Sequence, residues 1–245
     1  NIYLTQPEID QGDVIVETIQ DIISKSELDS IGLCFPGIKN DHGVVIMANG
    51  PRIPDLVDRI QGIGSIPHDS DCCVLGEWKS TIGKLQNCNN AVYIGGGTGI
   101  ADGIILKGKM IDFNARDDVK RSWELKIPSG ETIESCLSPK GMIHQWNLSQ
   151  REKVKTLDQL SKNQNADTIF EKATEAFSFL IQNRTQFFKA NHAKIEKIVI
   201  GQRLGIFMAN SKLISLLESN TDTPLDYSTD RRTAALGAAW KRICS

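Results

Sequence analysis

The spacing of apolar residues along the chain predicts helices alternating with short strands. Apolar side chains recur every three or four positions between residues 14 and 25, which predicts a helix with one buried face. Short apolar runs closed by Gly, Pro or Asn predict buried strands instead. This alternation is typical of an α/β fold. The expected strands are 31–35, 44–48, 91–94, 103–107 and 195–200, and the expected helices are 14–25, 54–61, 72–84, most of 150–189, 206–217 and 233–243.

Two segments differ from this simple alternation. Residues 116–145 are rich in Pro, Gly and Ser and are expected to be irregular. Within the long helical block, apolar residues recur at three- and four-residue intervals, which predicts one stripe buried in the core. The stripe consists of Phe170, Ala173, Phe177 and Leu180.

Composition narrows the class of protein. The chain has 245 residues, 40% of them hydrophobic, which is enough for a substantial core in one large domain or two lobes. A net charge of −2 without a basic run argues against nucleic acid as a partner. No apolar run approaches the ~20 residues of a membrane span, and the polar N-terminus lacks a signal-peptide pattern, so we expect no membrane association and a cytoplasmic location. Six cysteines without paired spacing indicate reduced thiols rather than disulfides or a zinc site.

The segment from Gly95 to Gly99 admits three nucleotide-site interpretations. A dinucleotide fingerprint requires a final glycine where Asp102 stands, and a Walker loop requires a Ser or Thr where Met110 stands. The third interpretation is a hairpin with Gly97, Thr98 and Gly99 at its tip, whose backbone N–H groups and hydroxyl bind phosphate. A tight hairpin that binds nothing explains the segment equally well.

A carboxylate-rich segment precedes the helix expected at 72–84. Its residues are His68, Asp69, Ser70 and Asp71. An Asp near a nucleotide can accept the proton of a hydroxyl that attacks the γ-phosphate. Asp is also a common helix cap, and this segment taken alone favours capping.

Taken together, these segments resemble the ROK family of sugar kinases and sugar-responsive repressors. The resemblance is strong over residues 31–109 and weaker from residue 116 onward. It rests on five segments in one order, with agreement at Ile198-Val-Ile-Gly201 and Ala235-Leu-Gly-Ala-Ala239. The five are Ile31-Gly-Leu-Cys-Phe-Pro-Gly37, Gly43-Val-Val-Ile-Met-Ala-Asn49, Pro67-His-Asp-Ser-Asp-Cys-Cys-Val-Leu-Gly-Glu77, Gly96-Gly-Thr-Gly-Ile100 and Gly103-Ile-Ile-Leu-Lys-Gly108.

The resemblance implies an actin-like ATPase fold with two lobes of ribonuclease-H-like topology. The N-terminal lobe is expected to span residues 1–90, completed by the C-terminal helix in 231–245, and the larger lobe residues 91–230. The implied activity is ATP- and Mg²⁺-dependent phosphorylation of a hexose or hexose-like sugar. The implied partners are that sugar and, in a homodimer, a second copy of this chain.

The same resemblance assigns roles to individual residues. Asp69 is the implied catalytic base, and Gly97, Thr98 and Gly99 form the second phosphate loop. By the same resemblance, Gly201 is expected near the adenosine. Gly37, Asn49 and His68 are expected near the sugar, and Glu124 is expected to bind the sugar as a further acid.

The chain departs from the family pattern in three places. No Asp-x-Gly-Gly-Thr-type phosphate hairpin precedes Ile31, so we expect either an incomplete N-terminal lobe or loss of that element. The family's cysteine-rich zinc motif is replaced by residues 135–144, so we expect no metal held by the protein. His68, Ser70 and Asp71 change the usual catalytic segment. These departures leave open a second interpretation, a degenerate relative that senses a sugar without transferring phosphate.

Overall fold

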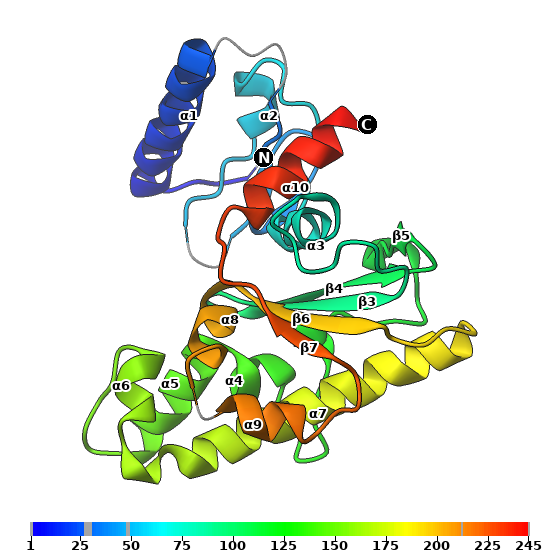
Figure 1. The fold of residues 1–245 in the computed structure, drawn as a ribbon. Coiled ribbons are helices and arrows are strands. Elements are labelled where there is room, and N and C mark those ends of the chain that lie inside the picture. The colour runs from blue at the N-terminus through cyan, green and yellow to red at the C-terminus, as the bar shows by residue number, and fades with distance from the viewer. Residues whose placement is uncertain (1, 27–30, 48–49, 212, 245) are drawn as a thin grey trace. The chain divides into compact units, whose positions relative to one another are not determined.

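A computed structural model describes residues 2–26, 31–47, 50–211 and 213–244, and its contacts divide the chain into two compact units (Figure 1). Unit 1 comprises Asn1–Ser80 and Arg232–Ser245, and unit 2 comprises Thr81–Arg231. The division falls after Ser80, whereas the sequence analysis drew its boundary after residue 90.

Unit 1 is mainly helical. Its helices are α1 (Gln6–Ser26), α2 (Leu56–Arg59), α3 (Asp69–Lys79) and α10 (Thr233–Ile243), and its sheet pairs β1 (Ile38–Lys39) with β2 (Val44–Ile46). Apolar residues from α1, β2 and α2 form a small core that includes Val16, Val44 and Leu56. The region expected to be a strand at 31–35 forms only an isolated bridge, between Phe35 and His68.

Small residues allow α3 and α10 to approach closely. A Cβ on Gly237 would lie 1.8 Å from the carbonyl oxygen of Cys72, and a Cβ on Gly76 would lie 1.8 Å from that of Thr233. Only glycine fits where two backbones approach so closely. Gly237 in α10 and Gly76 in α3 are therefore required by the packing of these two helices.

Unit 2 is built on a five-stranded sheet. Its strands are β3 (Ala91–Gly96), β4 (Ile100–Leu106), β5 (Lys109–Met110), β6 (Lys197–Gly201) and β7 (Leu225–Tyr227), in the order β5-β4-β3-β6-β7. β3 and β4 pair antiparallel as a hairpin from Ala91↔Ile105 to Gly96↔Ile100, whereas β3, β6 and β7 run parallel. The expected glycine-tipped hairpin is confirmed.

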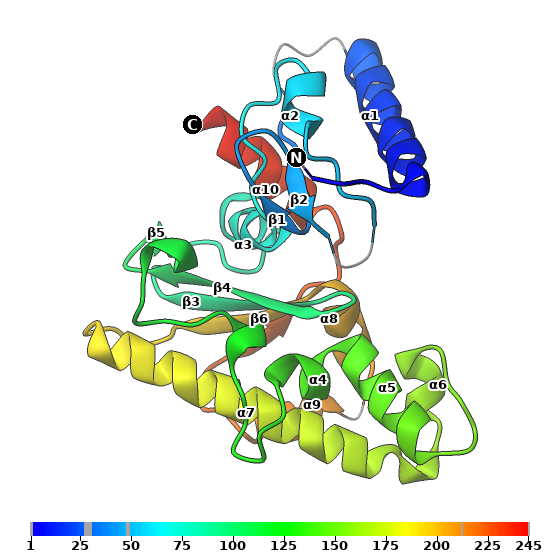
Figure 2. The same cartoon turned by 180° about the vertical axis from the view of Figure 1, so that it is seen from behind.

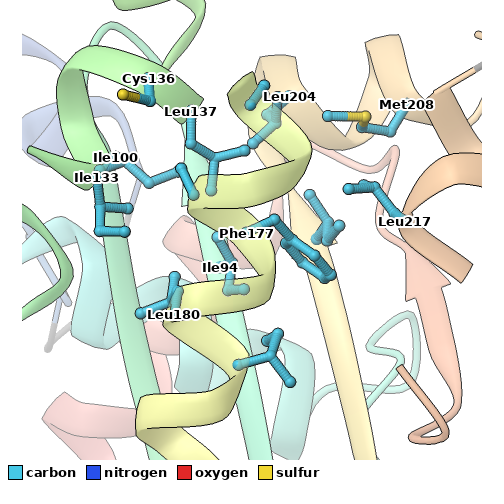
Figure 3. Packing of buried hydrophobic residues seen from close by; sticks show 14 of the residues in the cluster. Ile94, Ile100, Ile133, Cys136, Leu137, Phe177, Leu180, Leu204, Met208 and Leu217 are labelled. Carbon is cyan, nitrogen blue, oxygen red and sulfur yellow. The ribbon is translucent and has the colours of Figure 1, made fainter. Parts of the chain in front are cut away.

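The helices of unit 2 pack on one another and, in part, on this sheet. They are α4 (Ile133–Leu137), α5 (Pro139–Ser149), α6 (Leu157–Ser161), α7 (Asp167–Ala190), α8 (Gln202–Met208) and α9 (Leu213–Glu218). α7 runs across one face of the sheet (Figure 2), and Phe177 and Leu180 point toward Ile94 and its neighbours (Figure 3). The predicted core stripe of α7 is thus confirmed, with Phe177 and Leu180 fully buried. None of the described helices combines the length and apolar character that crossing a membrane requires.

Several expected element boundaries were wrong, three of them in ways that matter for the site. The segment 116–145 contains α4 and most of α5, because Thr132 and Ser138 accept capping hydrogen bonds from the backbone N–H groups of Ser135 and Gly141. The helix expected at 206–217 is two helices, α8 and α9. The helix expected from residue 72 begins at Asp69.

A buried ion pair joins the hairpin to α7 inside unit 2. The Nε of Arg184 donates to Oδ2 of Asp102 at 2.7 Å, and both side chains are completely buried. Oδ1 of Asp102 accepts from the Ser122 N–H at 2.8 Å, while Arg184 also donates to the carbonyl of Lys120 and to the side chain of Asn183. These additional hydrogen bonds compensate the desolvation of both charges.

Candidate functional site

In unit 1 the candidate residues gather where α3 begins. Asp69 is the first residue of α3, and its Oδ1 accepts a hydrogen bond from the N–H of Ser70 at 3.0 Å. The N-cap is His68, whose side chain makes no capping hydrogen bond. Asp69 is therefore not the helix cap that the isolated segment favoured. Its carboxylate is half-buried and lies at the N-terminal end of the helix.

The turn at Gly37 lies beside this helix start. Phe35 bridges in parallel to His68, and its N–H donates to the carbonyl of Pro67 at 3.3 Å. Gly37 has φ +87°, and a Cβ on it would lie 2.4 Å from the carbonyl oxygen of Ile46. A glycine is thus required at this turn for both conformational and steric reasons. Gly37 and His68 are brought together, whereas Asn49 lies outside the described residues.

Lys39, which the sequence analysis missed, holds the turn and His68 together. Its ammonium Nζ lies 2.7 Å from the carbonyl oxygens of both Phe35 and Gly37 and 3.2 Å from Nδ1 of His68. Burial lowers the pKa of Lys39, and the carboxylates of Asp69 and Asp71 oppose that shift. No pattern in the sequence indicates that this lysine turns back onto the segment before it.

In unit 2 the glycine tip meets two side chains from other elements. A Cβ on Gly97 would lie 2.8 Å from Oε1 of Gln202, and one on Gly99 would lie 3.0 Å from Oε2 of Glu134. Thr98 is exposed at the tip, and the N–H of Gly97 donates to the carbonyl of Gly99 at 3.1 Å. A carboxylate at this place favours a cation or a hydroxyl group and repels an uncompensated phosphate.

Gly201 ends β6 beside this hairpin, paired in register with Gly95. A Cβ on Gly201 would lie 2.4 Å from the hydroxyl oxygen of Tyr93, so packing alone explains a glycine here. The next residue, Gln202, has φ +60°, a conformation that costs a residue with a side chain roughly 1–2 kcal/mol. Its side chain lies against Gly95 and Gly97, which links the start of α8 to the hairpin tip.

Glu124 serves a local structural purpose. It is exposed in a short 3₁₀ turn (Ser122–Glu124), and its Oε2 accepts from the N–H of Arg121 at 2.7 Å. The carboxylate found against the glycine tip belongs to Glu134 instead, in the first turn of α4. Glu134 was not predicted as a site residue, because the Pro, Gly and Ser content of the surrounding segment favoured irregular structure.

No group of three or more His, Cys, Asp or Glu side chains in the described part of the chain is arranged to hold a metal ion.

Comparison with known proteins establishes the fold. No family model matches the chain, and no curated protein does. The chain is similar to a ROK hexokinase from Thermus thermophilus (TM-score 0.73, 17% identity, covering 96% of this chain and 87% of that one). It is also similar to a ROK family glucokinase from Streptomyces griseus in complex with glucose and AMPPNP (TM-score 0.67, 13% identity, covering 100% and 90%). A third similar structure is a ROK family transcriptional regulator, a homolog of the E. coli MLC protein (TM-score 0.69, 15% identity, covering 96% and 68%).

These likenesses confirm the predicted fold. The chain has the α/β, actin-like ATPase fold of the ROK sugar kinases. At such low identities the likeness carries no residue roles, so the roles assigned to residues of the site stay predictions.

Proposed function

We propose that the chain is an ATP-dependent kinase that phosphorylates a hydroxyl of a hexose or hexose-like sugar. The observation that carries the proposal is Asp69, a half-buried carboxylate at the start of α3 beside the Gly37 turn and His68. It occurs in a chain whose fold is that of ROK sugar kinases, including a glucokinase in complex with glucose and AMPPNP.

Asp69 acts as the general base. It accepts the proton of the sugar hydroxyl while that oxygen bonds to the γ-phosphorus and the bond to the β–γ bridging oxygen breaks, releasing ADP. Gly37 and His68 contact the sugar, and we assign Asn49 and Glu124 to the same substrate. Of these residues, Asp69, Gly37 and His68 lie near one another in unit 1, whereas Glu124 belongs to unit 2.

The hairpin tip binds the phosphates. The N–H of Gly97 is already bonded within the hairpin, so the N–H groups of Thr98 and Gly99 and the Thr98 hydroxyl serve the nucleotide. Gly201, at the end of β6, lies on the adenosine side. Mg²⁺ accompanies ATP and offsets the phosphate charge.

The test is ADP release with MgATP and a panel of hexoses and amino sugars. Asp69→Asn removes the base, and Asp71→Asn is the matched control because it removes a carboxylate from the same helical turn. We expect sugar-dependent turnover that falls roughly 10²- to 10⁴-fold in Asp69→Asn and less than threefold in Asp71→Asn. Near-normal turnover of Asp69→Asn would refute the assigned base.

A second candidate is a relative that senses a sugar without transferring phosphate. The likeness to a ROK family transcriptional regulator favours it. It predicts that a sugar raises the melting temperature while no ADP appears with any sugar in the panel. Turnover that depends on both the sugar and Asp69 would exclude it.

A further inference from the structure

Each of the three N–H donors of the Lys39 ammonium group has an acceptor nearby. An ammonium has three N–H donors and no lone pair. Nζ lies within hydrogen-bond distance of three acceptors: the carbonyls of Phe35 and Gly37, both at 2.7 Å, and Nδ1 of His68 at 3.2 Å. Lys39 is itself half-buried in β1, so the contact is held by the fold and is not a loose surface pairing.

This match determines which nitrogen of His68 carries its proton. Neutral imidazole bears one proton, and the nitrogen without it accepts hydrogen bonds. Facing an ammonium that only donates, Nδ1 must accept, so the proton lies on Nε2. Burial lowers the pKa of Lys39, and the carboxylates of Asp69 and Asp71 act in the opposite direction and favour its charged form. A neutral amine would instead accept from a protonated Nδ1, which gives the opposite tautomer.

We propose that Lys39 is a positioning residue of the sugar site, which fixes the Gly37 turn against His68 and holds the His68 proton on Nε2. The inference rests on the proposed function in placing Gly37 and His68 against the sugar. It sets the polarity of that contact: a sugar oxygen that meets Nε2 accepts a hydrogen bond. The Gly37 carbonyl, already bonded to Lys39, contributes at most one further lone pair.

Nitrogen NMR on histidine-labelled protein at pH 8 tests the contact directly. The chain has four histidines, so the variant His68→Gln assigns the signal of interest. We expect wild-type His68 to show an unprotonated Nδ1 and a protonated Nε2, and Lys39→Met to shift the Nδ1 signal. Lys25→Met is the matched control, because Lys25 pairs with Asp21 on exposed α1 and should leave the His68 signals unchanged. A protonated Nδ1 in the wild type, or identical His68 signals in Lys39→Met, overturns the proposal.

Substrate affinity tests the positioning role. Lys39→Met should weaken sugar binding roughly tenfold or more, as expected for loss of a hydrogen bond to a charged group, while the KM for ATP changes less than twofold. Lys39→Arg retains a cation and should recover part of the affinity. Equal losses for sugar and ATP would indicate general disruption and contradict the proposal.

The two proposals fail differently. If no sugar is phosphorylated, sugar affinity is measured by calorimetry in place of KM, and the NMR result still decides the Lys39–His68 contact. If turnover is normal but the His68 signals are the same in wild type and Lys39→Met, the proposed kinase activity is supported and the positioning role of Lys39 is refuted. A melting curve for each variant, with Lys39→Arg beside Lys39→Met, separates misfolding from loss of the contact.

Discussion

The buried pair Asp102–Arg184 is expected to be essential for unit 2, although it is a poor source of net stability. Asp102→Leu leaves a guanidinium group in a site with no exposure to solvent, and Arg184→Met leaves a carboxylate there. Removing one partner of a buried pair typically costs about 3–5 kcal/mol. Each single variant should therefore lose a large part of a total stability on the order of 5–15 kcal/mol.

The double variant distinguishes the interaction between the two charged side chains from their hydrogen bonds to the surrounding backbone. Asp102→Leu with Arg184→Met removes both charges but still orphans the Ser122 N–H and the Lys120 carbonyl, each worth about 1–3 kcal/mol when buried unpaired. We expect a loss of roughly 2–6 kcal/mol, compared with the roughly 6–10 kcal/mol obtained by adding the two single variants. The midpoints of these ranges correspond to a coupling energy of about 4 kcal/mol.

Urea unfolding followed by circular dichroism measures all four proteins of this cycle. Single variants too unstable to fold at 25 °C are measured at 10 °C, with the wild type alongside. Losses below about 1 kcal/mol for either single variant, or losses that add to within about 0.5 kcal/mol, would refute this description of the pair.

Two further predictions concern pH. The Arg52 guanidinium, which donates to both oxygens of Glu8, lowers the pKa of that carboxyl from 4.5 to about 2. The resulting stabilisation is complete above pH 4.5 and is lost as pH falls through about 2. Melting temperatures between pH 2 and 6 should therefore fall more steeply for wild type than for Glu8→Gln, and parallel curves would contradict this. Burial raises the pKa of Tyr227 to about 12, and its hydroxyl finds no hydrogen-bond partner among the described residues. Its neutral form stabilises the fold below pH ~10 and this contribution is lost toward pH 12. Tyr227→Phe should be neutral or stabilising at pH 7, within about 1 kcal/mol, and lose less stability above pH 10; a loss above 2 kcal/mol at pH 7 would reveal an essential contact of the hydroxyl.

The parts of the fold that local physics determines were predictable. The hairpin tipped by Gly97 and Gly99 follows from two apolar runs separated by glycines, and the helix at 233–243 from its apolar spacing. The caps of α4 and α5 could also have been predicted from the sequence. Thr132 and Ser138 each precede by three residues the backbone N–H group from which their side chains accept a hydrogen bond. Pro139 follows Ser138 at the first helical position, where proline is favoured. The Pro, Gly and Ser content of that segment pointed instead to irregular structure, and this prediction was wrong.

The missed site residues depend on tertiary placement. Lys39 reaches back to Gly37 and across to His68, which lies 29 residues further along the chain. Glu134 and Gln202 meet at the glycine tip from two different helices. None of these contacts has a sequence period, because each is set by how separately folded elements pack. Glu124 was selected by resemblance in the weakest part of the alignment, and its carboxylate accepts from the N–H of Arg121.

The most direct test of the central claim is detection of the phosphorylated sugar itself. Wild-type protein, Asp69→Asn and Asp71→Asn are incubated with MgATP and the best sugar of the panel, and sugar phosphate is quantified by mass spectrometry beside ADP. We predict sugar phosphate in one-to-one ratio with ADP for wild type and Asp71→Asn, and almost none for Asp69→Asn. ADP without sugar phosphate, or equal product from Asp69→Asn, would contradict the claim that this chain is a sugar kinase with Asp69 as its base.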